Sequence, residues 1–291
     1  MIALFTFERL LLLIVVSLFV VILLLFGFLG WFALPVFTHA TSPVFSLIWR
    51  PELDQYGILP MVAGSIMLSI LALLVALPIA IGICGFCLHS RHQRMANLVR
   101  FLVRLMASIP TVIYGLVAIF LLVPLLRETF AYGSGFSLLA ALIMVVLLIL
   151  PVMVLMLDSH TLPQLKQIRL SATALGFTET QIVFSVILPQ AKKAIATTAL
   201  LGFSRAIGDT LLPLMLAGNA PQISGNIFDS MRTLTAHIGL VIATENGSGA
   251  YNSLFAAGLL LLLSSIVVTL LIRSLEYRLS LPRIRGVNES R

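Results

Sequence analysis

Long apolar runs separated by short polar segments dominate the sequence. A helix needs about 20 apolar residues to cross the hydrocarbon core of a bilayer. Helices are the expected spanning elements, because each one satisfies its own backbone hydrogen bonds. The pattern therefore predicts an all-α membrane protein with six transmembrane helices, at residues 10–34, 58–88, 101–126, 138–157, 194–216 and 254–272.

The first apolar run, residues 10–34, resembles a secretory signal peptide in its position at the N-terminus. The apolar core of a signal peptide has about 7–15 residues, and this run is longer. It is also preceded by Glu8 beside Arg9, which is a weak positive flank. We therefore expect a first membrane helix that is retained.

Composition and charge placement agree with the six-span prediction. Hydrophobic residues make up 60% of the 291 residues and charged ones 10%, against about 25% charged in a soluble domain. Fourteen of the 18 Lys and Arg residues fall on the side of the membrane that holds both termini, and Arg50, Arg127 and Arg232 fall on the other. Since basic loops stay in the cytoplasm, both termini are predicted to be cytoplasmic.

Few residues suggest enzymatic or metal chemistry. No Gly-rich loop ends in Gly-Lys-Ser/Thr, so any ATP hydrolysis would belong to another chain. Cys84 and Cys87 precede His89 and His92 and could form a metal clip, but two buried small apolar residues explain the pair as well. His160 is expected to be a solvated loop residue and His237 a surface residue of an outer loop, rather than catalytic bases.

The cytoplasmic segment 158–193, between the fourth and fifth predicted spans, is predicted to contain two short helices. The first can end at Gly176, because glycine accepts the left-handed conformation of a helix C-cap. The second can begin at Thr178, with Gln181 completing a capping box, and can end at Pro189. On composition alone this segment could be an amphipathic hairpin lying on the membrane.

The fifth predicted span carries charged residues at membrane depth. Arg205 and Asp209 are four residues apart and would share a helix face. They could form a neutralising pair that locks helices together, or line an anion path, since charged residues in a membrane usually face a partner or a water-filled route. In the second case, a carboxylate at Asp209 could accept a hydrogen bond from protonated phosphate and repel sulfate.

Several motifs carry a resemblance to known families. The spacing of Ala172, Gly176, Val186, Leu188 and Pro189 resembles the cytoplasmic EAA loop of ATP-binding-cassette (ABC) importer permeases, although Leu170 and Ser171 replace the usual Glu and first Ala. Other stretches resemble, in order along the chain, the C-type permease subunits of phosphate-specific transport (Pst) importers. They are Trp49-Arg-Pro51, Ile109-Pro-Thr-Val-Ile-Tyr-Gly115, Arg205-Ala-Ile-Gly-Asp-Thr210 and Met231-Arg-Thr-Leu-Thr-Ala236. The family usually has Glu at the position of Asp209.

The resemblance implies a type I ABC importer permease fold, with residues 1–57 as an N-terminal helix and periplasmic loop, 58–278 as the permease core and 279–291 as a cytoplasmic tail. It implies a phosphate path that includes Arg205, Asp209 and Thr210, in a bacterial inner membrane. It also implies that the EAA-like residues couple the chain to an ATPase.

The partners implied are an A-type permease subunit, two copies of the ATPase and a periplasmic phosphate-binding protein. This chain would bind no cofactor, with ATP and Mg²⁺ held by the ATPase. Two alternatives remain: a permease for another oxyanion (molybdate, tungstate or sulfate), and a non-transporting membrane subunit that signals phosphate status.

Overall fold

The computed structural model describes residues 2–39, 45–89, 93–130, 133–242 and 248–280 of the chain. Its helices are α1 (Ile2–His39), α2 (Leu59–His89), α3 (Gln93–Ser108), α4 (Thr111–Val117), α5 (Val123–Phe130), α6 (Leu138–Ala174), α7 (Glu179–Gln181), α8 (Leu188–Gln190), α9 (Lys192–Ile207), α10 (Leu211–Leu216), α11 (Leu234–Val241) and α12 (Gly249–Ser280). Short π-helical segments, η2 (Ala118–Leu122) and η3 (Ile182–Ile187), continue α4 and α7, and a 3₁₀ turn (Pro51–Leu53) joins the antiparallel strands β1 (Trp49–Arg50) and β2 (Gln55–Tyr56).

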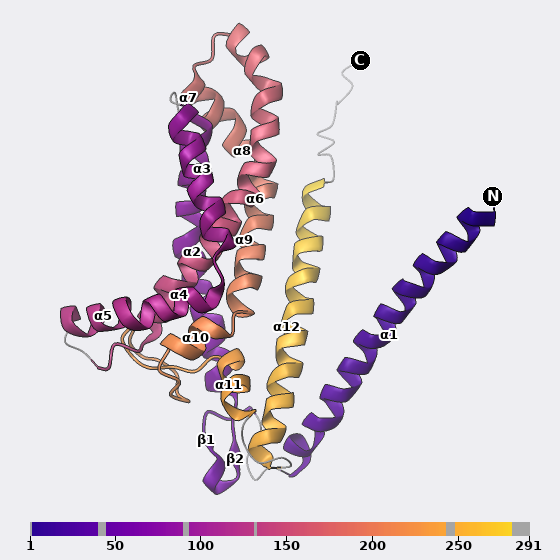
Figure 1. Ribbon diagram of the computed structural model, residues 1–291, viewed down its shortest axis with the longest axis vertical. Coiled ribbons are helices and arrows are strands. Elements are labelled where there is room, and N and C mark those ends of the chain that lie inside the picture. Colours follow the sequence, from indigo (N-terminus) through magenta and orange to yellow (C-terminus); the bar gives the residue numbers. More distant parts are fainter. Residues whose placement is uncertain (1, 40–44, 90–92, 131–132, 243–247, 281–291) are drawn as a thin grey trace, which may run out of the picture.

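A bundle of α2, α3, α6 and α9 forms the body of the molecule (Figure 1). Helix α12 runs beside this bundle, α1 leans away from it, and α4 and α5 project sideways. The beginning of α1, the end of α12 and the turn between α6 and α7 all lie toward one end, and the β1–β2 hairpin lies at the other. The end that holds the turn between α6 and α7 will be called the α6–α7 end, and the opposite end, with the β1–β2 hairpin, the hairpin end.

Among the described residues, five helical stretches are long and apolar enough to cross a membrane: Glu8–Thr38, Leu59–His89, Thr111–Phe130, Leu138–Ala174 and Gly249–Leu271. The first, second, fourth and sixth predicted spans are thus confirmed as apolar helices. Helix α6 continues well beyond the predicted fourth span, so the first short helix expected in segment 158–193 is the end of α6.

The third predicted span, residues 101–126, is wrong as a single helix. Helix α3 ends at Ser108, and Pro110 adopts an extended conformation with φ −59° and ψ 139° before α4 begins. Proline has no backbone N–H to donate and disfavours helical geometry in the residue before it. The apolar run therefore bends at Ile109–Pro110, and the stretch that can span the membrane starts at Thr111.

The fifth predicted span, residues 194–216, is also divided. Helix α9 ends at Ile207, and α10 begins at Leu211. This division explains why five, rather than six, continuous stretches meet the length and composition of a membrane span.

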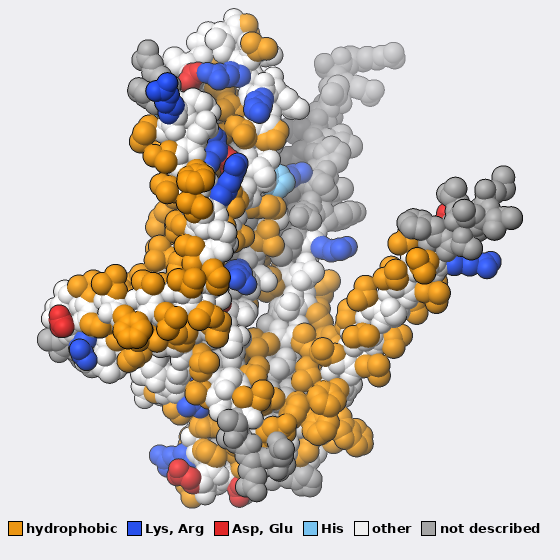
Figure 2. Space-filling view, viewed as in Figure 1, with side chains coloured by type: hydrophobic (Ala, Val, Ile, Leu, Met, Phe, Trp, Pro, Cys, Tyr) orange, Lys and Arg blue, Asp and Glu red, His pale blue; other side chains and the backbone are white. Residues whose placement is uncertain are grey.

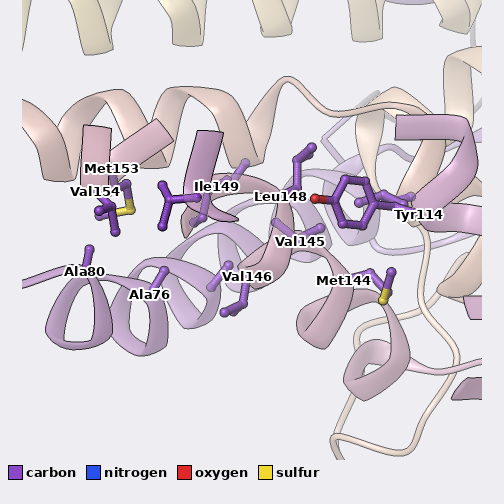
Figure 3. Close-up of a cluster of buried hydrophobic side chains, with 14 of the residues drawn as sticks. Ala76, Ala80, Tyr114, Met144, Val145, Val146, Leu148, Ile149, Met153 and Val154 are labelled. Carbon is purple, nitrogen blue, oxygen red and sulfur yellow. The ribbon is translucent and has the colours of Figure 1, made fainter. Parts of the chain in front are cut away.

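The core lies between α2 and α6, where small and large apolar side chains interlock. Ala76 and Ala80 of α2 are fully buried and face Ile149, Met153 and their neighbours on α6 (Figure 3). Without a hydrophobic driving force in lipid, helices associate through close packing, which small residues permit. Large apolar side chains instead cover the outer surfaces of α1, α4 and α5 (Figure 2), as expected for a chain surrounded by lipid.

The hairpin is fixed to α11 by an aromatic contact. The Trp49 ring meets the His237 ring edge-on, with centroids 4.5 Å apart. His237 is fully buried, so its prediction as a surface residue is wrong; its Nε2 lies 3.1 Å from Ser253 Oγ. Burial lowers the pKa of His237 to about 3, and the nearby charge of Arg232 adds to this, so the imidazole is neutral at physiological pH.

A buried ion pair ties α3 to α6. Arg100 Nε donates to Asp158 Oδ2 at 2.9 Å, and Arg100 Nη2 donates to Asp158 Oδ1 at 3.1 Å. The same Nη2 also donates to the carbonyl oxygen of Cys87, at the end of α2, at 3.3 Å. The two side chains are only 9% and 12% exposed, so one buried guanidinium connects three helices.

We expect Arg100→Ala to destabilise the fold by about 3–5 kcal/mol, because it leaves Asp158 buried without a counter-charge. Thermal unfolding of the detergent-purified chain measures this loss. Arg104→Ala, an exposed position on the same helix, serves as the matched control and should change the midpoint little. The double variant Arg100→Met/Asp158→Leu should recover much of the stability, and an additive double variant would contradict the paired role.

Candidate translocation site and coupling segment

The division between α9 and α10 is held open by side chains that replace lost helical hydrogen bonds. Asp209 is buried, and its Oδ2 accepts from the backbone N–H of Leu212 at 3.0 Å. Thr235 of α11 donates its hydroxyl to the carbonyl oxygen of Asp209 at 2.9 Å. The interruption is therefore a defined structure, in which the carboxylate caps the start of α10.

Arg205 and Asp209 do not form the pair that their spacing suggested. Among the described residues, ion pairs join Arg100 to Asp158 and Arg169 to Glu179, whereas Arg205 and Asp209 form none. The expectation of a shared helix face is wrong, because α9 ends at Ile207 and Asp209 follows it. Arg205 is exposed in the last turn of α9, and its guanidinium forms no direct ion pair with an acid among the residues that the structure describes.

A cavity of about 350 Å³ lies beside the division, between the end of α9, α11 and α12. Thr210 lines it, whereas Arg205 and Asp209 are not among its lining residues. Hydroxyl groups form much of its polar wall, contributed by Ser204, Thr210, Thr235, Ser264 and Ser265. The cavity thus has hydroxyl-bearing residues and no charged residue in its lining, next to the point where the apolar helix is interrupted.

The segment between α6 and α9 confirms the local predictions for its turn. Gly176 follows the end of α6 with φ +82°, a conformation that L side chains rarely adopt. Thr178 then caps α7, accepting from the N–H of Gln181, while Gln181 Oε1 accepts from the N–H of Thr178 at 2.9 Å. Pro189 lies in the single turn of α8, and the chain leaves helical geometry at Ala191 before α9 begins.

This segment has one packed face and one exposed face. Ala172, Ile182, Val183 and Ile187 are buried against the core of α2 and α6. Leu170 is 84% exposed and Leu175 is 77% exposed, and Gly176 and Pro189 are also exposed. Val186 and Leu188 are half-buried. The segment therefore presents apolar side chains at the α6–α7 end, available to another protein.

The two cysteines form no metal site with other residues in the described part of the chain. Cys84 and Cys87 are buried free thiols, and Cys84 Sγ lies 3.3 Å from Thr161 Oγ1. No group of three or more His, Cys, Asp or Glu residues that could hold a metal ion occurs in the described part of the chain. His92, which the metal-clip alternative requires, lies outside the described residues, and His160 is exposed on α6.

The sequence reasoning missed the Arg100–Asp158 ion pair. A signal was present, because Asp158 is the first charged residue after Glu128 and ends a long uncharged run. An acid at that position needs a partner if α6 continues through it. The prediction placed a loop there instead, where a charge needs no partner.

The long apolar helices are typical of an integral membrane protein, and the exposed apolar segment at one end leaves a surface for another chain. Residues 75–281 match the model of the binding-protein-dependent transport system inner membrane component family, and the chain belongs to that family. It is therefore a permease subunit of an ABC importer, a class that works with an ATPase and a substrate-binding partner.

Individual relatives cover most of the chain. The probable ABC transporter permease protein YqgH of Bacillus subtilis is 34% identical over 258 residues, covering 86% of this chain and 84% of that protein. The phosphate transport system permease protein PstC of Pasteurella multocida is 29% identical, covering 79% and 78%. PstC of Xylella fastidiosa strain Temecula1 is 27% identical, covering 83% and 80%.

A solved structure confirms the predicted fold. A chain of the MetNI methionine ABC transporter, in an inward-facing conformation, superposes with a TM-score of 0.59. The match covers 78% of this chain and 99% of that chain at 16% identity. The two chains thus share the type I importer permease fold. Their sequence identity is too low to indicate a common substrate.

If the cavity beside the division is open to water, Thr210→Cys should react with a membrane-impermeant maleimide in a background where Cys84 and Cys87 are replaced by alanine. Ala206→Cys is the matched control, because Ala206 lies one turn earlier and is buried. Labelling is measured by the mass shift of the purified chain. Equal labelling at both positions would contradict a water-filled cavity.

Proposed function

We propose that this chain moves inorganic phosphate inward across a bacterial inner membrane, as the C-type permease subunit of a phosphate importer. Phosphate is proposed as the substrate because the chain is similar, over most of its length, to several proteins named PstC phosphate transport permeases. The motifs of the fifth predicted span, which resemble that family, lie at the division between α9 and α10.

The chemistry of the division supports an anionic substrate. The guanidinium of Arg205 is a permanent charge whose planar donors match a tetrahedral oxyanion. Interrupted helices in membrane proteins are tolerated where they line a cavity or a water-filled route. In this proposal Arg205 attracts phosphate to the path, and the hydroxyl of Thr210 receives it in the adjoining cavity.

In this proposal Asp209 contributes to the path indirectly, by capping the start of α10. One of its oxygens is engaged by Leu212 N–H, and its backbone carbonyl is engaged by Thr235. In this proposal the carboxylate fixes where α10 starts. It thereby also fixes the positions of Arg205, before Asp209, and of Thr210, after it. This role differs from direct contact with a phosphate hydroxyl, and the two roles predict different effects of Asp209→Asn.

The exposed face of segment 158–193 is the proposed contact with the ATPase. In this proposal Gly176 and Pro189 lie on that face, and buried Ala172 and half-buried Val186 and Leu188 hold it against the core, in the spacing of an EAA loop. Leu170 presents an apolar group where the family has Glu. In the proposed assembly, an A-type permease subunit completes the path and two ATPase copies bind ATP and Mg²⁺. A periplasmic phosphate-binding protein delivers substrate at the hairpin end, and both termini lie in the cytoplasm.

Uptake of ³²P-phosphate by vesicles that contain the assembled transporter tests the proposal. We expect Arg205→Ala to reduce ATP-driven uptake by roughly tenfold or more, since a charge-assisted contact is lost. Arg205→Lys should be intermediate, because it keeps the charge but not the planar fork. Arg104→Ala should transport like the unmodified protein.

The same vesicles distinguish the alternatives. Excess sulfate or molybdate should fail to compete with phosphate, and full competition would assign the chain to another oxyanion. An assembly that hydrolyses ATP but accumulates none of these anions would instead support a signalling subunit. Either result contradicts the proposed substrate without changing the fold.

Asp209→Asn should retain phosphate uptake within about twofold of the unmodified protein, because Asn caps helices about as well as Asp. Asp209→Ala should lower uptake further, since it removes the cap and destabilises the start of α10 by about 1 kcal/mol. Uptake is compared at equal protein level. If Asp209→Asn alone abolished uptake, or admitted sulfate, the carboxylate would contact the substrate directly.

A further inference from the structure

A charged cavity of about 250 Å³ lies at the α6–α7 end, between the end of α2, α3, α6 and α7. It is separate from the hydroxyl-lined cavity at the α9–α10 division and from an entirely apolar one between α4 and α6. Its lining residues are Cys87, Leu88, Gln93, Arg100, Leu162, Leu165, Lys166, Arg169 and Glu179. Figure 2 shows Lys and Arg side chains gathered on this end of the molecule.

The three cations of this cavity are paired to different extents. Arg100 is held by buried Asp158 in a two-point contact that uses Nε and Nη2. Arg169 pairs with Glu179, but both side chains are about half exposed, at 58% and 49%. Lys166 forms no hydrogen bond or ion pair within the part of the chain that the structure describes. The cavity therefore has one surplus positive charge and one weakly held carboxylate.

We infer that this cavity binds a phosphate group, with Lys166 and Arg169 as its direct contacts and Glu179 as a built-in competitor for Arg169. An exposed ion pair is worth little in water, so a phosphate can displace the Glu179 carboxylate. Phosphate oxygens accept hydrogen bonds from both a lysine ammonium and the fork of an arginine. The Arg100–Asp158 pair is buried and stays intact, forming a fixed polar wall without net charge.

Two sources can supply this group at the same place. One is the headgroup of an anionic lipid, since basic pockets between membrane helices on the cytoplasmic side bind such headgroups. The other is free inorganic phosphate in the cytoplasm. The shared chemistry is a phosphate group that reaches Lys166 and Arg169 from the surface of the α6–α7 end.

Occupation of the cavity would act on the neighbouring turn. The Arg169–Glu179 pair joins the last part of α6 to the first residue of α7 across Gly176. A phosphate that takes Arg169 releases Glu179, which directly follows the capping residue Thr178. The consequence for coupling to the ATPase rests on the proposed function, whereas binding itself does not.

Binding is tested on the full-length chain in nanodiscs. In the first arm, equilibrium dialysis with ³²P-phosphate uses nanodiscs made only of phosphatidylcholine. In the second, native mass spectrometry counts phosphatidylglycerol retained from mixed nanodiscs without added phosphate. In the arm that shows binding, Lys166→Gln should weaken it by roughly tenfold or more, since one charge-assisted contact is lost. Glu179→Gln should strengthen it, because the competing carboxylate is removed.

Lys193→Gln is the matched control, as an exposed lysine at the start of α9 outside the cavity. Binding in the first arm identifies free phosphate as the ligand, and binding in the second identifies an anionic lipid. The inference is overturned if neither arm shows binding, if Lys166→Gln binds like Lys193→Gln, or if Glu179→Gln weakens binding. Phosphate binding that is lost in Arg205→Ala but kept in Lys166→Gln belongs to the transport path and also overturns it.

Discussion

The fold depends on the requirement that every backbone polar group away from water has a partner. Unbroken helices meet this requirement alone, but the chain also departs from helix between α9 and α12. In the described part of this stretch, several freed groups are bound by neighbours: Leu234 N–H by Ser65 Oγ at 2.8 Å, Leu216 carbonyl by Ser137 N–H at 2.9 Å, and Leu214 carbonyl by the Asn219 amide at 2.7 Å. The approach of the chain to α2 is so close that a Cβ on Gly64 would lie 2.5 Å from the carbonyl oxygen of Arg232. The irregular stretch after α9 is thus stabilised by bonds from α2, from the residue before α6 and from within the stretch itself.

The same requirement connects the fold to the proposed transport path. The interruption after Ile207 brings Thr210 and neighbouring hydroxyl groups to a cavity and leaves Arg205 exposed at the end of α9. Asp209 and Thr235 stabilise that interruption from inside the protein. At the α6–α7 end, Gly176 and the Thr178–Gln181 capping box shape a second turn. The two regions are joined by α9, so a displacement of the segment beside the proposed ATPase contact reaches the division through one helix of 16 residues.

Patterns that depend on local chemistry could be predicted from the sequence, and patterns that depend on distant partners could not. The apolar helices, the left-handed Gly176 and the capping box each follow from a few consecutive residues. Hydropathy averaged over a span concealed the divisions at Pro110 and Gly208, because apolar residues lie on both sides of each. Periodicity placed Asp209 on a helix that had already ended. The burial of His237 depends on Trp49, which is 188 residues earlier, and the pairing of Arg100 depends on helix α6 extending past its predicted end. Such contacts leave no periodic signal in either segment.

The pairing of Arg100 with Asp158 also constrains how the protein is made. The two residues are 58 positions apart, so α3 emerges from the ribosome well before the acid that neutralises its arginine. Until α6 has been synthesised and inserted, the guanidinium of Arg100 has to remain hydrated at the membrane surface. The buried contact between α3 and α6 can therefore form only after Asp158 has been synthesised, and the packing of α3 is completed only once α6 is present.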